Sequence, residues 1–122
     1  MRVYVPISVA DVERRRADGY WTIGERRAWA VNQPLIRALP DEDDEGREYI
    51  ASLSAASDSP AHMALAADLP TSMLGDEGVD GDVRVAGVIA DNLVACLLCL
   101  DPNDDEALLW FAPNELDALL QR

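Results

Sequence analysis

The amino-acid sequence predicts the α+β class, as a small two-layer sandwich of a mixed sheet packed by helices. Segments with the patterns of strands interleave along the chain with segments that carry a helical face. The chain has 122 residues, which is short enough for one domain, and 49% of them are hydrophobic, which suffices for one core. We therefore expect residues 1–122 to form a single globular α+β domain.

The N-terminal segment carries local signals for a strand and a helix. Its β-branched and aromatic residues predict a strand over residues 2–6. Ser8 and Asp11 have the spacing of a capping box, and Gly19 is typical of the end of a helix. We therefore expect a helix over residues 9–17.

The next segment predicts a second strand and two helices. Residues 27–31 have strand character, and Asn32 begins a short helix that ends before Pro40. After the acidic run at 41–45, apolar residues recur at helical spacing, which predicts a helix with one buried stripe. The stripe consists of Tyr49, Ile50, Leu53 and Ala56.

Strands are expected to dominate the second half of the chain. Residues 62–69 fit a helix or a strand, and the flanking prolines and short length favour the strand. Residues 76–82 predict a turn-rich loop, followed by an alternating strand pattern at 83–85. The unbroken apolar run at 93–100 predicts a central strand covered on both faces.

The C-terminal segment predicts one more strand and a final helix. Residues 108–111 fit a short strand, and Pro113 occupies a first helical position. We expect Trp110 and Phe111 to anchor this helix to the sheet. The apolar residues that share a face of the helix are Leu116, Leu119 and Leu120.

The charge of the chain is strongly negative and unevenly distributed. Ten basic residues, all of them Arg, stand against 23 Asp and Glu, which gives a formal charge of −13. Residues 1–40 are nevertheless net basic. This balance opposes direct nucleic-acid binding and favours a protein partner or self-association. The excess acids lie in three runs, at 41–48, 76–82 and 101–106.

Localisation and cofactors are predicted from what the sequence lacks. No apolar run reaches the ~18 residues that a membrane-spanning helix needs, and the N-terminus has no signal-peptide pattern. No glycine motif for binding phosphate occurs. We therefore expect a cytoplasmic protein with no membrane partner and no cofactor.

Few residues have the types and spacings of a chemical site. Cys96 and Cys99 lie on a predicted strand that holds them too far apart for a disulfide, so we expect buried, reduced thiols. His62 is the only histidine and has no neighbours that would form a catalytic relay. The acidic run from Asp41 resembles a calcium loop but has Ser52 where a bidentate Glu is required. We therefore assign no catalytic residue and no metal ligand.

Three short motifs lie at 1–6 (MRVYVP), 64–70 (ALAADLP) and 108–116 (LLWFAPNEL). In this order they resemble a family of short, acidic actinobacterial proteins that is classed as a domain of unknown function. The chain is shorter than the family between Leu100 and Leu108, where an additional helical segment would be expected. The resemblance implies an actinobacterial source and no particular activity.

These observations favour a non-enzymatic, cytoplasmic interaction or regulatory module with a charged contact surface. One alternative is a small carboxylate-dependent enzyme with acids at strand ends, and another is a nucleic-acid mimic whose acidic runs align on one face. The expected interaction residues are Arg14, Arg15, Arg16, Asp41, Glu42, Asp43 and Asp44. The acids considered for the enzyme are Asp68, Asp91 and Asp101.

Overall fold

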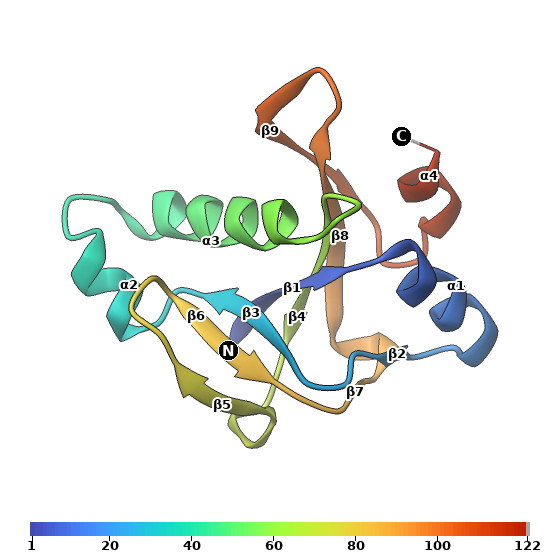
Figure 1. Cartoon of the computed structure of the whole chain (residues 1–122), viewed down its shortest axis with the longest axis horizontal. Coiled ribbons are helices and arrows are strands. Elements are labelled where there is room, and N and C mark those ends of the chain that lie inside the picture. The colour runs from blue at the N-terminus through green and yellow to red at the C-terminus, as the bar shows by residue number, and fades with distance from the viewer. Residues whose placement is uncertain (122) are drawn as a thin grey trace.

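A computed structural model describes residues 1–121, in which seven strands form one large sheet and two form a small one (Figure 1). The α+β class is confirmed, but neighbouring strands are antiparallel at each described pairing, so the sheet is not mixed. The small sheet pairs β2 (Trp21–Thr22) with β7 (Val88–Ile89). In spatial order, the large sheet consists of β5 (Leu74–Glu77), β6 (Asp82–Val85), β3 (Arg26–Ala30), β1 (Arg2–Ile7), β4 (Met63–Asp68), β8 (Val94–Asp101) and β9 (Asp104–Phe111).

Both faces of the large sheet are covered, in contrast to the predicted two-layer sandwich (Figure 1). Alternate residues of β1 supply the reason, because Val3 and Val5 enter one apolar core while Tyr4 enters the other. Helices α1 (Val9–Asp18) and α4 (Leu116–Leu120) contribute to the first core, together with the small sheet. Helices α2 (Gln33–Ala38) and α3 (Asp44–Asp58) contribute to the second.

The central strand of the large sheet is β1, not the apolar run predicted for that place. That run forms β8, which is the neighbour of the edge strand β9. Leu97 and Leu98 are buried in different cores, so the expected cover on both faces is present. An apolar run reports burial on both faces, but it carries no information on the position of a strand in the sheet. The strand expected near residues 62–69 is confirmed as β4.

Local capping determines where the first helices begin. The Ser8 side chain accepts a hydrogen bond from the Asp11 N–H, and the Asp11 carboxylate accepts one from the Ser8 N–H, so the capping box of α1 is confirmed. Gly19 ends α1 in the left-handed conformation with φ of 82°. Asn32 caps α2 by accepting from the Leu35 N–H. The short strands β2, β7 and β5 and the 3₁₀ turns η1 (Thr71–Met73) and η2 (Asp91–Leu93) were not predicted.

Helix α3 faces the sheet with small side chains rather than with the predicted stripe. Of that stripe, Ala56 is buried, Ile50 and Leu53 are half-buried, and Tyr49 is exposed. Large side chains fill this core from the sheet side, where Tyr4 and Trp29 lie, and this leaves room only for small residues on the helix. The buried residues of α3 are Ala51, Ser52, Ala55 and Ala56.

The two aromatic residues at the end of β9 point to opposite faces of the sheet, and only one of them packs against α4. Phe111 packs against the same core as Leu116 and Leu119 of α4. Trp110 lies on the opposite face of β9 and is 52% exposed, so the prediction that it anchors α4 was wrong. The helix also begins later than Pro113, at Leu116.

Candidate functional site

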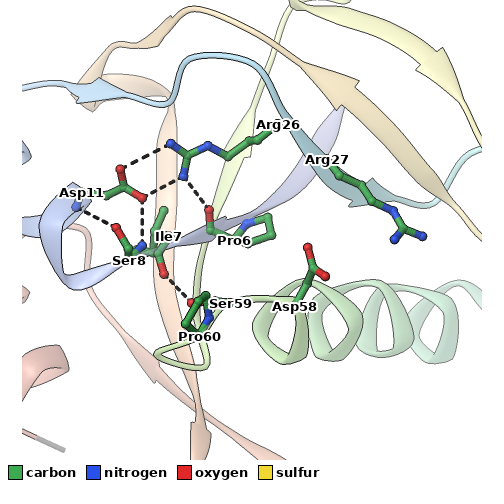
Figure 2. Close-up of a pocket in the computed structure, with 9 residues that line it drawn as sticks. All are labelled: Pro6, Ile7, Ser8, Asp11, Arg26, Arg27, Asp58, Ser59 and Pro60. Atoms are coloured by element: carbon green, nitrogen blue, oxygen red, sulfur yellow. Dashed lines mark hydrogen bonds and ion pairs between the residues drawn. The ribbon is translucent and has the colours of Figure 1, made fainter.

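A first pocket of about 310 Å³ lies where β1, β3, α1 and α3 meet (Figure 2). Arg26 and Asp11 form its charged centre, and the guanidinium Nη1 lies 2.8 Å from the Asp11 Oδ2. Most polar groups in this pocket are engaged with one another, as the dashed lines in Figure 2 show. We call this arrangement the Arg26 network.

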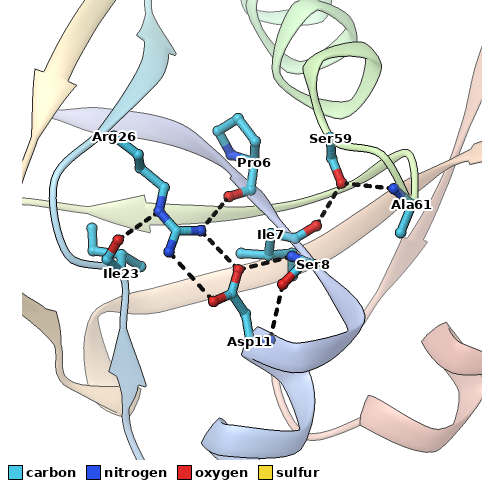
Figure 3. Close-up of polar contacts among 8 residues, drawn as sticks. All are labelled: Pro6, Ile7, Ser8, Asp11, Ile23, Arg26, Ser59 and Ala61. Carbon is cyan, nitrogen blue, oxygen red and sulfur yellow. Dashed lines mark hydrogen bonds and ion pairs between the residues drawn. The ribbon is translucent and has the colours of Figure 1, made fainter.

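The Arg26 guanidinium ties three parts of the chain together (Figure 3). It donates to the Ile23 carbonyl at 2.6 Å, to the Pro6 carbonyl at 3.0 Å and to both Asp11 oxygens. Burial alone would raise the pKa of Asp11, but hydrogen bonds from Arg26 and from the Ser8 N–H and hydroxyl hold it below its ordinary value. The network therefore fixes the start of α1 against β1 and the segment before β3.

Ser59 completes this pocket from the end of α3. Its buried hydroxyl donates to the Ile7 carbonyl at 2.5 Å and accepts from the Ala61 N–H at 3.2 Å (Figure 3). Arg27 and Asp58 lie at the other side of the pocket (Figure 2). Arg27 pairs with Asp82 at 3.4 Å, so the interactions of this pocket mainly hold the fold together.

A second pocket of about 300 Å³ lies along one flank of α3, between this helix and the edge strand β9. We call it the α3–β9 groove. Tyr4 enters it from β1 and Trp110 from β9, whereas the other lining residues come from α3. The six lining residues are Tyr4, Glu45, Glu48, Tyr49, Ser52 and Trp110.

Two tyrosines shape the α3–β9 groove. The hydroxyl group of the buried Tyr4 donates a hydrogen bond to the Glu48 carboxylate. Burial raises the pKa of Tyr4, and the hydrogen bond to Glu48 raises it further, so the phenol keeps its proton at neutral pH. The Tyr49 hydroxyl donates to the Glu106 carbonyl of the β8–β9 hairpin. These contacts link α3 to β1 and to the hairpin, on the flank where Trp110 lies.

The groove combines exposed aromatic rings with carboxylates that no cation balances. Tyr49 is 40% exposed and Trp110 is 52% exposed. None of the six lining residues is basic. Within residues 1–121, the six arginines in ion pairs all have Asp partners, so Glu45 and Glu48 take part in none of these pairs. The groove is thus suited to a positively charged group with an apolar or planar surface.

The predicted arginine cluster is largely engaged within the molecule. Arg15 pairs with Asp91 at 2.9 Å, and Arg16 pairs with Asp117 of α4. Arg14 is exposed. Two of the three guanidinium groups therefore connect α1 to η2 and α4, and the structure does not bring the cluster to the first acidic run, which lies at the start of α3 (Figure 1).

The first acidic run caps α3. Asp43 accepts a hydrogen bond from the Gly46 N–H at 2.7 Å, and Asp44 lies 3.4 Å from the Arg47 guanidinium. Asp41 and Glu42 are exposed. This run leads directly into Glu45 and Glu48 of the groove, so part of the predicted acidic surface adjoins it.

The acids considered for an enzyme are not brought together. Asp68 and Asp101 end the neighbouring antiparallel strands β4 and β8, which places them at opposite ends of the sheet. Asp68 is paired with Arg2 at 2.8 Å, and this hydrogen bond lowers the pKa of Asp68. Asp91 pairs instead with Arg15.

The three acidic runs lie at different turns. The run at 76–82 is next to α2, because Asn32 donates to the Gly81 carbonyl at 3.3 Å. The run at 41–48 spans the α2–α3 connection and the start of α3, and the run at 101–106 lies at the projecting end of the β8–β9 hairpin (Figure 1). An alignment of all three on one face stays a prediction.

The histidine lies in a turn, and the two cysteines lie on strand β8. His62 is exposed and adopts a left-handed conformation, with φ of 59°, in the turn between α3 and β4. Cys96 is half-buried and Cys99 is buried, and neither of them forms a disulfide. Burial raises the pKa of the Cys96 thiol. In the described part of the chain, His, Cys, Asp and Glu residues form no cluster suited to a metal ion, and no helix is long and apolar enough to cross a membrane.

Sequence reasoning did not identify the groove. Tyr4 was assigned only to a strand, Tyr49 to a buried stripe, and Trp110 to the contact with α4. A usable signal was the alternation along β9, because Trp110 and Phe111 must point to opposite faces of a strand. Glu45 and Glu48 had a second signal, since they lie one helical turn apart.

The fold and the groove together define a small α+β protein with an acidic, aromatic pocket on one flank of a helix. Residues 1–98 match a family of unknown function, DUF6912, and the chain belongs to this family. The expected kinship with a domain of unknown function is confirmed, while the motif at 108–116 lies beyond the matched residues. An actinobacterial source stays a prediction. No curated protein and no solved structure matches the chain.

Proposed function

We propose that this protein is an interaction module that binds a basic segment of a partner protein in the α3–β9 groove. The observation that carries the proposal is a pocket with two carboxylates and two exposed aromatic rings, in which no lining residue is basic. Such a site gains from a cation both by charge attraction and by contact with the ring faces.

The charge of the whole chain supports the same class of partner. A formal charge of −13 attracts basic molecules over distances of about one Debye length, which is ~8 Å at physiological salt. Internal arginines could compete with an external basic segment for the carboxylates of the groove. Within the described residues, six arginines are already paired with aspartates. An external basic segment therefore meets a surface with excess negative charge.

The proposed setting is the cytoplasm. Cys96 and Cys99 form no disulfide, which fits a reducing compartment. The geometry favours binding over catalysis, because Asp68, Asp91 and Asp101 are held by different partners at separate places.

The experiment that tests this function measures binding of a hexa-lysine peptide by calorimetry. The double variant Glu45→Gln/Glu48→Gln should weaken binding about tenfold, since each exposed ion pair contributes up to ~1 kcal/mol. The matched control is Glu13→Gln/Glu25→Gln, which removes the same charge from exposed positions elsewhere. Equal loss in both double variants would show that the peptide responds only to net charge and would refute the groove as the site.

A further inference from the structure

We infer that the α3–β9 groove takes an arginine side chain of the partner in preference to lysine, with the guanidinium against Tyr49 and Trp110 and paired with Glu45 and Glu48. This inference rests on the proposed function and specifies its ligand. A volume of about 300 Å³ lies at the lower end of the ~300–1,000 Å³ of small-molecule pockets. The groove is therefore sized for one long side chain and not for a large ligand.

The other flank of α3 shows how this protein holds a guanidinium. The Arg27 guanidinium carbon lies 4.7 Å from the centroid of the Trp29 ring, and its Nε lies 3.4 Å from the Asp82 carboxylate. Trp29 faces the same core as Tyr4, so both aromatic sites lie on the face of the sheet that α3 covers. The groove offers the same two elements, a tryptophan ring and carboxylates, but none of its lining residues is an arginine.

The two walls of the groove fit a planar cation. Tyr49 extends from α3 and is anchored by its hydrogen bond to the Glu106 carbonyl. Trp110 extends from β9 and is half exposed. Glu48 is oriented by the Tyr4 hydroxyl, so one of its oxygens has a defined position before any ligand binds.

Arginine suits this arrangement better than lysine for a physical reason. A guanidinium is planar and weakly hydrated, stacks on aromatic faces and donates two parallel hydrogen bonds to a carboxylate. A lysine ammonium is a compact, strongly hydrated charge that keeps its water beside an exposed ring. The groove should therefore distinguish two peptides of equal charge.

The test compares hexa-arginine with hexa-lysine, which carry the same charge, in calorimetric titrations of the full chain. We expect hexa-arginine to bind about fivefold more tightly, the effect of one additional cation–π contact of about 1 kcal/mol. Trp110→Leu should weaken hexa-arginine binding more than hexa-lysine binding and so reduce this preference. Tyr20→Leu is the matched control, because Tyr20 is 43% exposed outside the groove.

The outcomes separate this inference from the proposed function. Equal binding of both peptides, lost in Glu45→Gln/Glu48→Gln and kept in Trp110→Leu, would overturn the arginine preference and retain the basic-segment function. Binding that is insensitive to both groove variants would overturn both proposals. Spermidine that binds the groove more tightly than hexa-arginine at equal concentration of charge would identify a free polyamine as the occupant and overturn a protein segment. Dimerisation that Trp110→Leu abolishes would identify a second copy of the chain as the occupant of the groove. This result would also overturn a segment of a partner protein.

Discussion

Two pockets of nearly equal size adjoin α3, one of about 310 Å³ at its C-terminal end beside β3 and one of about 300 Å³ along the flank that faces β9. On the β3 side, the Arg26 guanidinium is surrounded by a carboxylate and two carbonyls that accept its hydrogen bonds. On the β9 side, Glu45 and Glu48 line a pocket without a basic residue. Volume does not distinguish these pockets, whereas internal charge balance does.

The difference indicates which pocket serves the fold and which can serve a ligand. A charged group whose partners lie within the chain stabilises the native state and has little left to offer an incoming molecule. A carboxylate that no internal cation balances is tolerated where water reaches it, and it can still bind an external cation when, as at Glu48, one oxygen accepts a hydrogen bond from Tyr4.

The largest effect is expected from removing Arg26. Arg26→Met should lower the free energy of unfolding by about 2 to 3 kcal/mol, because it removes the donor to two carbonyls and leaves the Asp11 carboxylate without its cation, held only by Ser8. Urea denaturation measures this loss. Glu45→Gln/Glu48→Gln, on the other flank, should change the same quantity by no more than ~0.5 kcal/mol. Similar losses of unfolding free energy in the two variants would contradict the assignment of one pocket to the fold and the other to a ligand.

The second prediction concerns the pH dependence of stability. The pKa of Asp11 is lower in the folded state than its ordinary value of ~3.9, so the native state binds fewer protons than the unfolded state. The contribution of Asp11 is therefore fully present above pH ~4 and is lost as pH falls through the folded pKa. The Arg2–Asp68 pair, in which the pKa of Asp68 is also lowered, acts in the same direction.

Asp11→Asn tests this sign. The variant should be less stable than the wild type at pH 7, and the difference in unfolding free energy should shrink as the pH is lowered below ~4. In an Arg26→Met background the substitution should no longer lower the stability at pH 7 and should partly restore it, because burial without the arginine raises the pKa of Asp11. A difference that grows toward acid pH would show that the sign is wrong.

The third effect is that of salt. Sodium chloride should raise the midpoint of thermal unfolding at pH 7 by a few degrees, because the acids in the three runs repel one another and the Debye length falls to ~10 Å at 0.1 M. Glu45→Gln/Glu48→Gln should reduce this rise. If salt lowers the midpoint instead, favourable pairs with arginine outweigh the repulsion between acids.

The smallest effect on stability is expected at Trp110. Trp110→Leu should leave the free energy of unfolding within ~0.5 kcal/mol of the wild type, because half of this side chain is already in water. Phe111→Leu is the internal comparison, since Phe111 packs on the core beside α4 and should cost more. Urea denaturation of both variants decides whether Trp110 belongs to the groove or to the core.

Part of the fold and little of the candidate site could be predicted from the sequence. The start and end of α1 depended on Ser8, Asp11 and Gly19, which act through contacts with their own neighbours in the chain. The groove depends on Tyr4, Glu48 and Trp110, which come from three elements far apart in the sequence. Nothing in their local patterns brings these residues together.

Local sequence patterns are sufficient to predict the α+β class, the capped starts of α1 and α2, the strand character of β1, β4 and β8 and the acidic balance of the chain. These features follow from local backbone preferences and from composition. The strand order, the cover on both faces of the sheet and the side of α3 that meets the sheet depend instead on tertiary contacts. The physical reason is packing between distant segments, because Tyr4 and Trp29 occupy the space that the larger side chains of α3 would otherwise fill. Tyr49 is thereby left at the surface, on the flank where β9 presents Trp110.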